Sequence, residues 1–222
     1  MELSRQAGGI GTIGIGETNT ERMKRHLKEK ERRIKDKLET YQKGRDLQRA
    51  SRKRNNLKTI AIVGYTNAGK TTLLNALSGR REYAANELFA TLDTRVGQLY
   101  LPKRGEVTLV SDTIGFIKQL PPELLNAFSS TLSEAVDSDL LLHVADASDK
   151  HFFQQLDVVD DILKRLGVDQ KPRILVLNKT DIVSTLVVND IIRRLGDRKA
   201  ICISAQKRTG LKELISKIEA IL

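Results

Sequence analysis

The chain has 222 residues, enough for one α/β domain and a smaller appendage. Hydrophobic residues make up 40% of the sequence and support a core, whereas 4% aromatic residues and no Trp argue against an aromatic stacking platform for nucleic acid. The formal net charge is +10, and because residues 21–54 hold 15 Lys or Arg against 6 Asp or Glu, the basicity of one segment points to a polyanionic partner.

Residues 1–17 form a glycine-rich segment. Gly9, Gly11 and Gly14 match the G-x-G-x-x-G fingerprint of dinucleotide-binding folds. That fingerprint must follow a β-strand, and only eight residues without strand alternation precede Gly9. We therefore interpret residues 1–17 as a glycine-rich loop and not as a dinucleotide site.

Residues 18–56 are charged and helical in character. Leu27, Ile34 and Tyr41 recur every seven residues and form a narrow apolar stripe suited to a two-helix contact. Gly44 interrupts this pattern, which resumes a few residues later. The pattern predicts a basic antiparallel helical hairpin, with a single solvated helix as the alternative.

Residues 57–222 alternate between strand-like and helical patterns. Alternation of this kind predicts an α/β domain of the P-loop GTPase fold, with a mostly parallel six-stranded sheet and helices on both faces. The expected strands are Thr59–Val63, Val96–Leu101, Val107–Val110, Leu140–Ala145, Arg173–Leu177 and Ala200–Ile203, and the expected helices are 70–79, 122–136, 152–166, 187–195 and 210–221. His143 lies within an apolar strand, and we expect it to be packed.

A phosphate-binding loop follows the first strand. Residues 64–71 read G-Y-T-N-A-G-K-T, which matches G-x-x-x-x-G-K-[ST] with a strand before it and a helix after it. Backbone N–H groups and the helix N-terminus would hold the phosphates, Lys70 would reach the β- and γ-phosphates, and Thr71 would ligate Mg²⁺. The predicted nucleotide contacts here are Gly64, Asn67, Ala68, Gly69, Lys70, Thr71 and Thr72.

A D-x-x-G motif, Asp112 to Gly115, ends the strand Val107–Val110. Asp112 would hold the magnesium ion, and the Gly115 N–H would meet the γ-phosphate. The next residue in Ras-like enzymes is a Gln that orients the attacking water, but here it is Phe116, which cannot make a side-chain hydrogen bond. Catalytic help must therefore come from elsewhere if GTP is hydrolysed.

Two loops predict guanine recognition. Residues 178–181 read N-K-T-D after a strand, and the Asp181 carboxylate can accept hydrogen bonds from the guanine N1–H and 2-amino groups, which adenine lacks. Lys179 would pack over the base, and Asn178 would tie this loop to the P-loop. Ser204 and Ala205 are placed to meet the guanine carbonyl. The motifs together predict a guanine-nucleotide-binding domain.

A mobile threonine should also reach the metal while the γ-phosphate is present. Thr91, in the segment F-A-T-L-D-T-R, is our candidate, with Thr94 as its rival. Arg95 is a candidate cis arginine, although a surface ion pair is the commoner use of such a residue.

The motifs together resemble the HflX family of GTPases. The resemblance rests on G-Y-T-N-A-G-K-T-T-L, L-F-A-T-L-D-T, D-T-I-G-F-I-K-Q-L-P, L-L-H-V-A-D-A-S, N-K-T-D and, before the basic segment, G-E-T-N-T-E. Family members carry a further N-terminal domain, and we expect this chain to lack most of it. The glycine-rich loop departs from the family pattern at Ile13, Ile15 and residues 19–21. The resemblance implies a GTPase that binds the large ribosomal subunit and its RNA, in ribosome splitting, rescue or biogenesis.

Related GTPases with an apolar residue in place of the Gln often carry an Asn at the fourth P-loop position, here Asn67, where it helps to hold K⁺. This implies that K⁺ replaces an arginine finger. The catalytic candidates are Lys70, Asn67, Thr91 and Gly115. The expected metal ligands are Thr71, Thr91 and Asp112. The expected cofactors are Mg²⁺ and, as a hypothesis, K⁺.

We expect a cytoplasmic monomer without a membrane span that hydrolyses GTP slowly unless a partner activates it. The alternatives are a nucleotide-gated RNA- or ribosome-binding module with negligible hydrolysis and, with less support, a membrane or protein-signalling GTPase.

Overall fold

The computed structural model describes residues 23–33, 36–37, 40, 44, 57–78, 95–113, 115–116 and 134–222. The chain divides into two units, Met1–Ser51 and Arg52–Leu222. In the first unit, residues 23–33 are helical and solvent-exposed. Gly44, where we expected the helix to be interrupted, is itself helical, because a single glycine costs a helix only about 1 kcal/mol. The hairpin as a whole and the glycine-rich loop lie outside the described residues.

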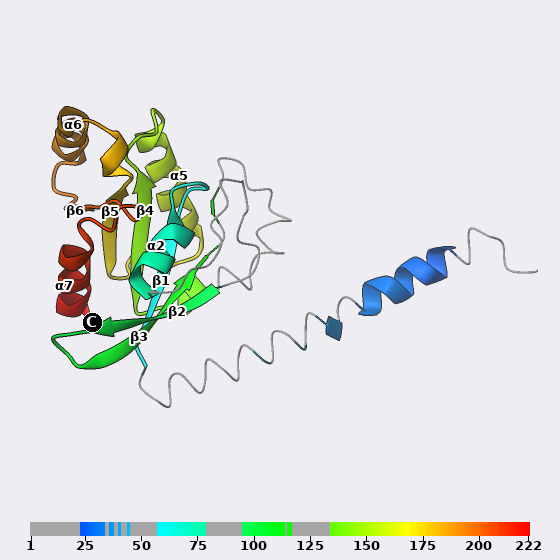
Figure 1. The fold of residues 1–222 in the computed structure, drawn as a ribbon. Helices are drawn as coiled ribbons and strands as arrows, with labels where there is room; N and C mark the ends of the chain where they lie inside the picture. Colours follow the sequence, from blue (N-terminus) through cyan, green and yellow to red (C-terminus); the bar gives the residue numbers. More distant parts are fainter. Residues whose placement is uncertain are drawn as a thin grey trace, which may run out of the picture. The chain divides into compact units, whose positions relative to one another are not determined.

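In the second unit, the described residues form one six-stranded sheet (Figure 1). Its order is β2-β3-β1-β4-β5-β6, and β2 alone runs antiparallel to its neighbour. The strands are β1 (Thr59–Gly64), β2 (Arg95–Leu101), β3 (Glu106–Asp112), β4 (Leu140–Asp146), β5 (Arg173–Asn178) and β6 (Ala200–Cys202). All six predicted strands and the mostly parallel sheet are confirmed.

Helices cover both faces of the sheet. Those with described bounds are α2 (Lys70–Ser78), α5 (Phe152–Arg165), α6 (Thr185–Leu195) and α7 (Leu211–Ile221), with a short 3-10 helix, η1 (Thr180–Ile182). Leucines of α2 and α7 pack against one face, and apolar residues of α5 and α6 pack against the other. The central strand β4 is buried along its whole length, which explains why its sequence is apolar apart from His143 and Asp146. No helix in the described part of the chain is long and apolar enough to cross a bilayer.

His143 is packed in β4, as predicted, with 2% of its surface exposed. Burial, reinforced by the positive charges of Arg173 and Arg198, lowers the pKa of its imidazole to about 3, although Asp160 opposes the shift. The unfolded chain therefore binds a proton at His143 near pH 6.5, while the folded chain does not until about pH 3. Folding stability from this group is present above pH 6.5 and falls as the pH drops.

We expect the free energy of unfolding to decrease by about 1.4 kcal/mol per pH unit below 6.5 through this group alone. Urea denaturation at pH 7 and pH 5 measures the change. His143→Gln should remove most of the loss between these two pH values. An equal loss in both proteins would show that His143 does not carry it.

Candidate nucleotide-binding site

The predicted nucleotide motifs lie at one edge of the sheet, where the parallel strands end. The P-loop follows β1, Asp112 ends β3, Asn178 ends β5, and Ser204 follows β6. Parallel pairing explains this convergence, because Ile62 on β1 is in register with Asp112, and Asp146 on β4 is in register with Asn178. Motifs separated by more than 100 residues are thus brought to one edge.

Lys70 and Thr71 begin α2 at the end of the P-loop. The Lys70 Nζ donates a hydrogen bond to the Tyr65 carbonyl at 2.9 Å, so the ammonium lies over the loop. Burial lowers the pKa of Lys70 to about 8, and the negative charge of Asp112 partly opposes the shift. Phosphate oxygens are the partners that would restore its preference for the charged form.

Thr71 and Asp112 lie in direct contact. The Thr71 hydroxyl donates to the Asp112 carboxylate at 2.6 Å, and Asp112 is 0% exposed. A hydroxyl and a carboxylate are the hard oxygen donors that Mg²⁺ prefers, and these two are close enough to serve one ion. The residues therefore fit a magnesium ion held between α2 and β3.

Close backbone packing requires glycine at two of the predicted positions. A Cβ on Gly69, whose φ is +91°, would lie 2.3 Å from the Asn178 Nδ2 atom. A Cβ on Gly115 would lie 2.8 Å from the Thr66 Cα and 2.9 Å from the Lys70 Nζ. The D-x-x-G segment thus packs so closely against the P-loop that Gly115 leaves no room for a side chain of its own.

Asn178 joins three loops. Its side-chain amide donates to the Ala68 carbonyl at 2.9 Å, and its oxygen accepts from the Ala205 N–H at 3.0 Å. Thr180 adds a bond from its hydroxyl to the Ile203 carbonyl. The predicted tie between the N-K-T-D loop and the P-loop is present, and it extends to the S-A loop. Asp181 lies in η1, three residues after Asn178, and its side chain is exposed.

Asp146 is a site residue that sequence reasoning missed. At the end of β4, its carboxylate pairs with the Lys179 Nζ at 2.7 Å and accepts bonds from the N–H and hydroxyl of Ser148. Lys179 has a φ of +62°, and this ion pair fixes its side chain. A carboxylate at the end of a buried and largely apolar strand was the signal that could have identified it.

Phe116 is buried and not part of a solvent-facing site. Its ring is 1% exposed and packs in the core with Val63, Leu141 and Val159. Its backbone N–H donates to the Gly64 carbonyl at 3.1 Å, and its carbonyl accepts from the Thr66 N–H at 2.9 Å. Phe116 therefore anchors the D-x-x-G segment to the P-loop. Thr91 and Thr94 lie outside the described residues, and Arg95 begins β2.

We expect Phe116→Gln to destabilise the fold by about 3 kcal/mol and to leave GTP hydrolysis no faster, because the amide would be buried in an apolar cluster. Phe116→Leu, which keeps the apolar contact, should cost about 1 kcal/mol. Urea denaturation and phosphate release measure the two effects. A stable glutamine variant with faster hydrolysis would contradict the anchoring role.

The P-loop GTPases are defined by three features on a mostly parallel sheet. These are a P-loop followed by a helix, a hydroxyl and a carboxylate that fit a metal ion, and an N-K-T-D loop. A family model described as "50S ribosome-binding GTPase" matches residues 59–179, and one described as "GTP-binding GTPase Middle Region" matches residues 1–52. GTPase HflX of Caldanaerobacter subterraneus subsp. tengcongensis is 46% identical over 218 residues, 98% of this chain and 49% of that protein. The chain belongs to the HflX family of GTPases.

Solved structures agree with this assignment. SsGBP in complex with GDP superposes with a TM-score of 0.63 at 31% identity, covering 93% of this chain and 62% of that one. Era, in a complex with MgGDPNP and a segment of 16S ribosomal RNA, gives a TM-score of 0.62 at 25% identity, covering 75% of this chain and 57% of that one. The chain spans about half the length of the curated relatives that it matches.

Proposed function

We propose that this chain binds GTP with Mg²⁺ and hydrolyses it to GDP and phosphate. The observation that carries this proposal is the Thr71–Asp112 contact of 2.6 Å beside the buried Lys70. The three groups provide two oxygen ligands and one cation at the edge where the P-loop ends. Because the chain belongs to a family of GTPases, the comparisons support GTP hydrolysis in addition to GTP binding.

Each residue has a role that follows from its position. The P-loop N–H groups and Lys70 stabilise negative charge on the β- and γ-phosphates as the bond to the leaving oxygen lengthens. Thr71 and Asp112 would hold Mg²⁺, which neutralises phosphate charge. Gly115 lies against Lys70, where a Cβ would be 2.9 Å from the Nζ, and its N–H is the proposed donor to the γ-phosphate. Asp181 would select guanine, and Thr91, which lies outside the described residues, is the proposed additional metal ligand in the GTP state.

We propose that Asn67 helps to hold K⁺ against the phosphates, in place of an arginine finger. Asn67 is exposed and has a φ of +61°, a conformation that asparagine tolerates well. This backbone geometry is an alternative reason for its presence. Hydrolysis should be faster in KCl than in NaCl, and Asn67→Ala should remove the difference. Equal rates in the two salts for the original protein would dismiss a role for K⁺.

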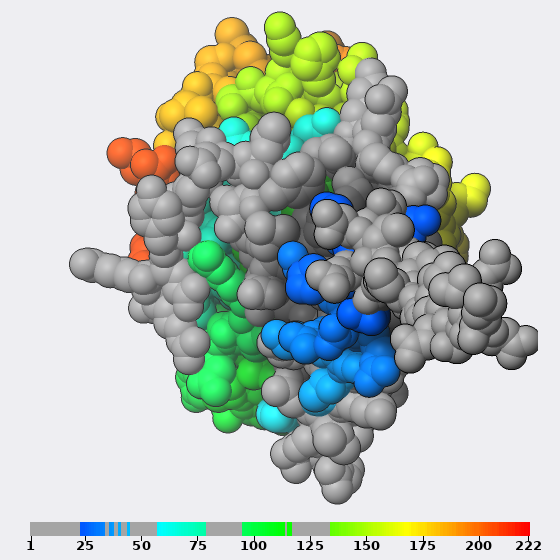
Figure 2. Space-filling view, turned by 90° about the vertical axis from the view of Figure 1, so that its right-hand side faces the viewer, coloured from blue at the N-terminus to red at the C-terminus, as the bar shows by residue number. Residues whose placement is uncertain are grey.

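We further propose that the chain associates with the large ribosomal subunit. The matching family is described as ribosome-binding, and one similar structure, Era, holds ribosomal RNA. Residues 23–33 add an exposed helical surface with six Lys or Arg and two Glu. They are among the residues drawn in blue in Figure 2. A basic helix of this kind favours phosphate contacts.

The test is GTP hydrolysis in KCl with and without purified large ribosomal subunits. Acceleration supports both proposals. Binding to the subunit that weakens steeply with salt, without acceleration, supports a second candidate: a nucleotide-gated binding module with negligible hydrolysis. The burial of Phe116 favours this candidate, because no glutamine can orient water there. If the subunits neither accelerated hydrolysis nor bound the chain, the ribosomal proposal would be refuted. The rate of intrinsic hydrolysis would then be judged separately.

A further inference from the structure

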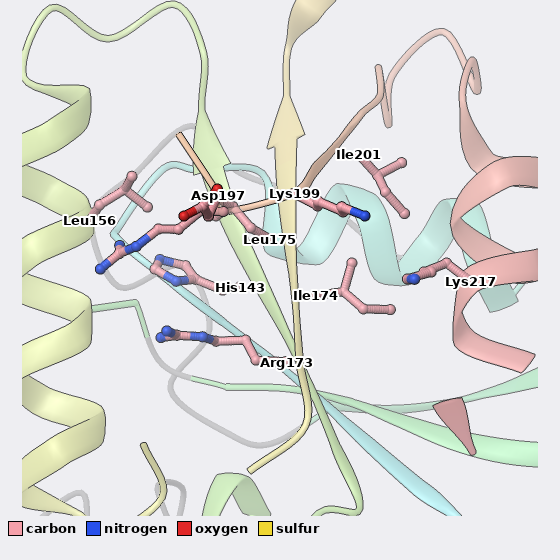
Figure 3. Close-up of a pocket in the computed structure, with 10 residues that line it drawn as sticks. His143, Leu156, Arg173, Ile174, Leu175, Asp197, Lys199, Ile201 and Lys217 are labelled. Carbon is pink, nitrogen blue, oxygen red and sulfur yellow. The ribbon is translucent and has the colours of Figure 1, made fainter. Parts of the chain in front are cut away.

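A second pocket, of about 350 Å³, lies away from the nucleotide motifs (Figure 3). It surrounds the beginning of β5, at Arg173 and Ile174, whereas the N-K-T-D motif follows the other end of that strand. The two ends are about 17 Å apart for six residues of β-strand. The pocket exists because β6 pairs only with Leu175–Leu177 and leaves the first residues of β5 uncovered.

Cationic side chains from three segments line this pocket. They are Arg173 of β5, Arg198 and Lys199 just before β6, and Lys217 of α7, against a single lining carboxylate, Asp197. Figure 3 shows Arg173 on the same side of β5 as His143, and Lys199 and Lys217 on the other side. Among the residues that the structure describes, neither lysine forms an ion pair or hydrogen bond. Their charge is available to a ligand.

The arginines are held in place. Asp160 on α5 accepts a bond from the Arg173 Nη1 at 2.5 Å and one from the Arg198 Nη1 at 2.9 Å. One carboxylate thus positions two guanidinium groups, and each keeps further N–H donors for a ligand. The negative charge of Asp160 also offsets part of the positive charge of the two arginines. The net positive charge of the pocket therefore comes mainly from Lys199 and Lys217.

His143 adds an imidazole to the wall of this pocket. It lines the pocket, is 2% exposed, and forms no hydrogen bond to any described residue, since its Nδ1 lies 4.0 Å from the Asp160 Oδ1. Leu156, Ile174 and Ile201 supply an apolar lining beside it.

We propose that this pocket is a second anion-binding site, which takes a compact phosphate-bearing ligand. Two guanidinium groups and two ammonium groups suit an oxyanion with two or more negative charges, and a neutral imidazole can donate to one of its oxygens. The phosphate could come from a free small molecule or from RNA. The inference does not depend on GTP hydrolysis. Because β5 and β6 begin at this pocket and lead into the guanine loops, its ligand would contact the strands that carry them.

The test is a titration of the full chain with pyrophosphate while saturating GDP and Mg²⁺ occupy the P-loop. NMR of the imidazole groups reports the site directly, because the chain has only three histidines. The His143 resonance should shift, and those of His26 and His151 should not. Lys199→Gln combined with Lys217→Gln should weaken binding about tenfold or more, since two charge-assisted contacts are lost.

Lys212→Gln is the matched control, because Lys212 is exposed on the same helix as Lys217 but does not line the pocket. It should bind pyrophosphate normally, and all three substitutions should leave GTP hydrolysis without partners unchanged. Short single-stranded RNA with a 5′-phosphate or a 5′-hydroxyl distinguishes the sources. A His143 shift with RNA alone assigns the phosphate to RNA. No shift with any probe, or full binding by the double variant, overturns the proposal.

Discussion

Lys70→Ala is expected to lower the rate constant for GTP hydrolysis by at least about a hundredfold. Lys70 is the only charged P-loop side chain, and it is 7% exposed with its Nζ hydrogen-bonded to the Tyr65 carbonyl. Removing one preorganised donor from a site that stabilises developing negative charge typically has this effect. Single-turnover phosphate release measures the rate, and nucleotide titration separates it from loss of GTP binding.

The folded state should survive this substitution. Burial lowers the pKa of Lys70 because the nucleotide-free fold disfavours its charge, so losing the ammonium removes an unfavourable interaction. The melting temperature of the nucleotide-free protein should therefore remain within about 5 °C of the original. Lys103→Ala, at a surface hydrogen bond to Ser216, is a control that should hydrolyse GTP normally. Unimpaired hydrolysis in Lys70→Ala would contradict the proposed site.

Asp181→Asn should change the base that the protein prefers. The carboxylate can accept two hydrogen bonds from guanine, and each charge-assisted bond contributes about 1.5–3 kcal/mol. GTP affinity should fall between about a hundredfold and ten-thousandfold. An asparagine amide can donate to the 2-oxo group of xanthine, so xanthosine triphosphate should bind better than GTP.

Competition titrations with GTP, xanthosine triphosphate and ATP measure this preference. ATP should gain nothing, because adenine offers neither the N1–H nor the 2-oxo group. Asp181 is exposed in η1, so the substitution should leave folding unchanged. If GTP kept its affinity, the guanine contact would belong to another residue.

The sequence alone determined the strands and the residue types at their ends. Five apolar runs predicted β1 and β3 to β6, because strands inside a parallel sheet that is covered on both faces are mostly apolar, and a further strand was predicted near Val96–Leu101. The P-loop and D-x-x-G motifs could be located because their function depends on glycine at particular backbone positions. Asn178 was similarly predictable, since the parallel sheet brings its strand end to the P-loop edge.

Only the tertiary structure decided how distant side chains combine. Phe116 is a core residue because β1, β4 and α5 enclose its ring, and nothing in its own segment states this. Lys179 meets Asp146 through the pairing of β4 with β5. The basic pocket depends on how far β6 extends along β5 and on one carboxylate of α5. Local patterns determine which elements form, whereas the contacts between elements depend on register and packing over the whole sheet.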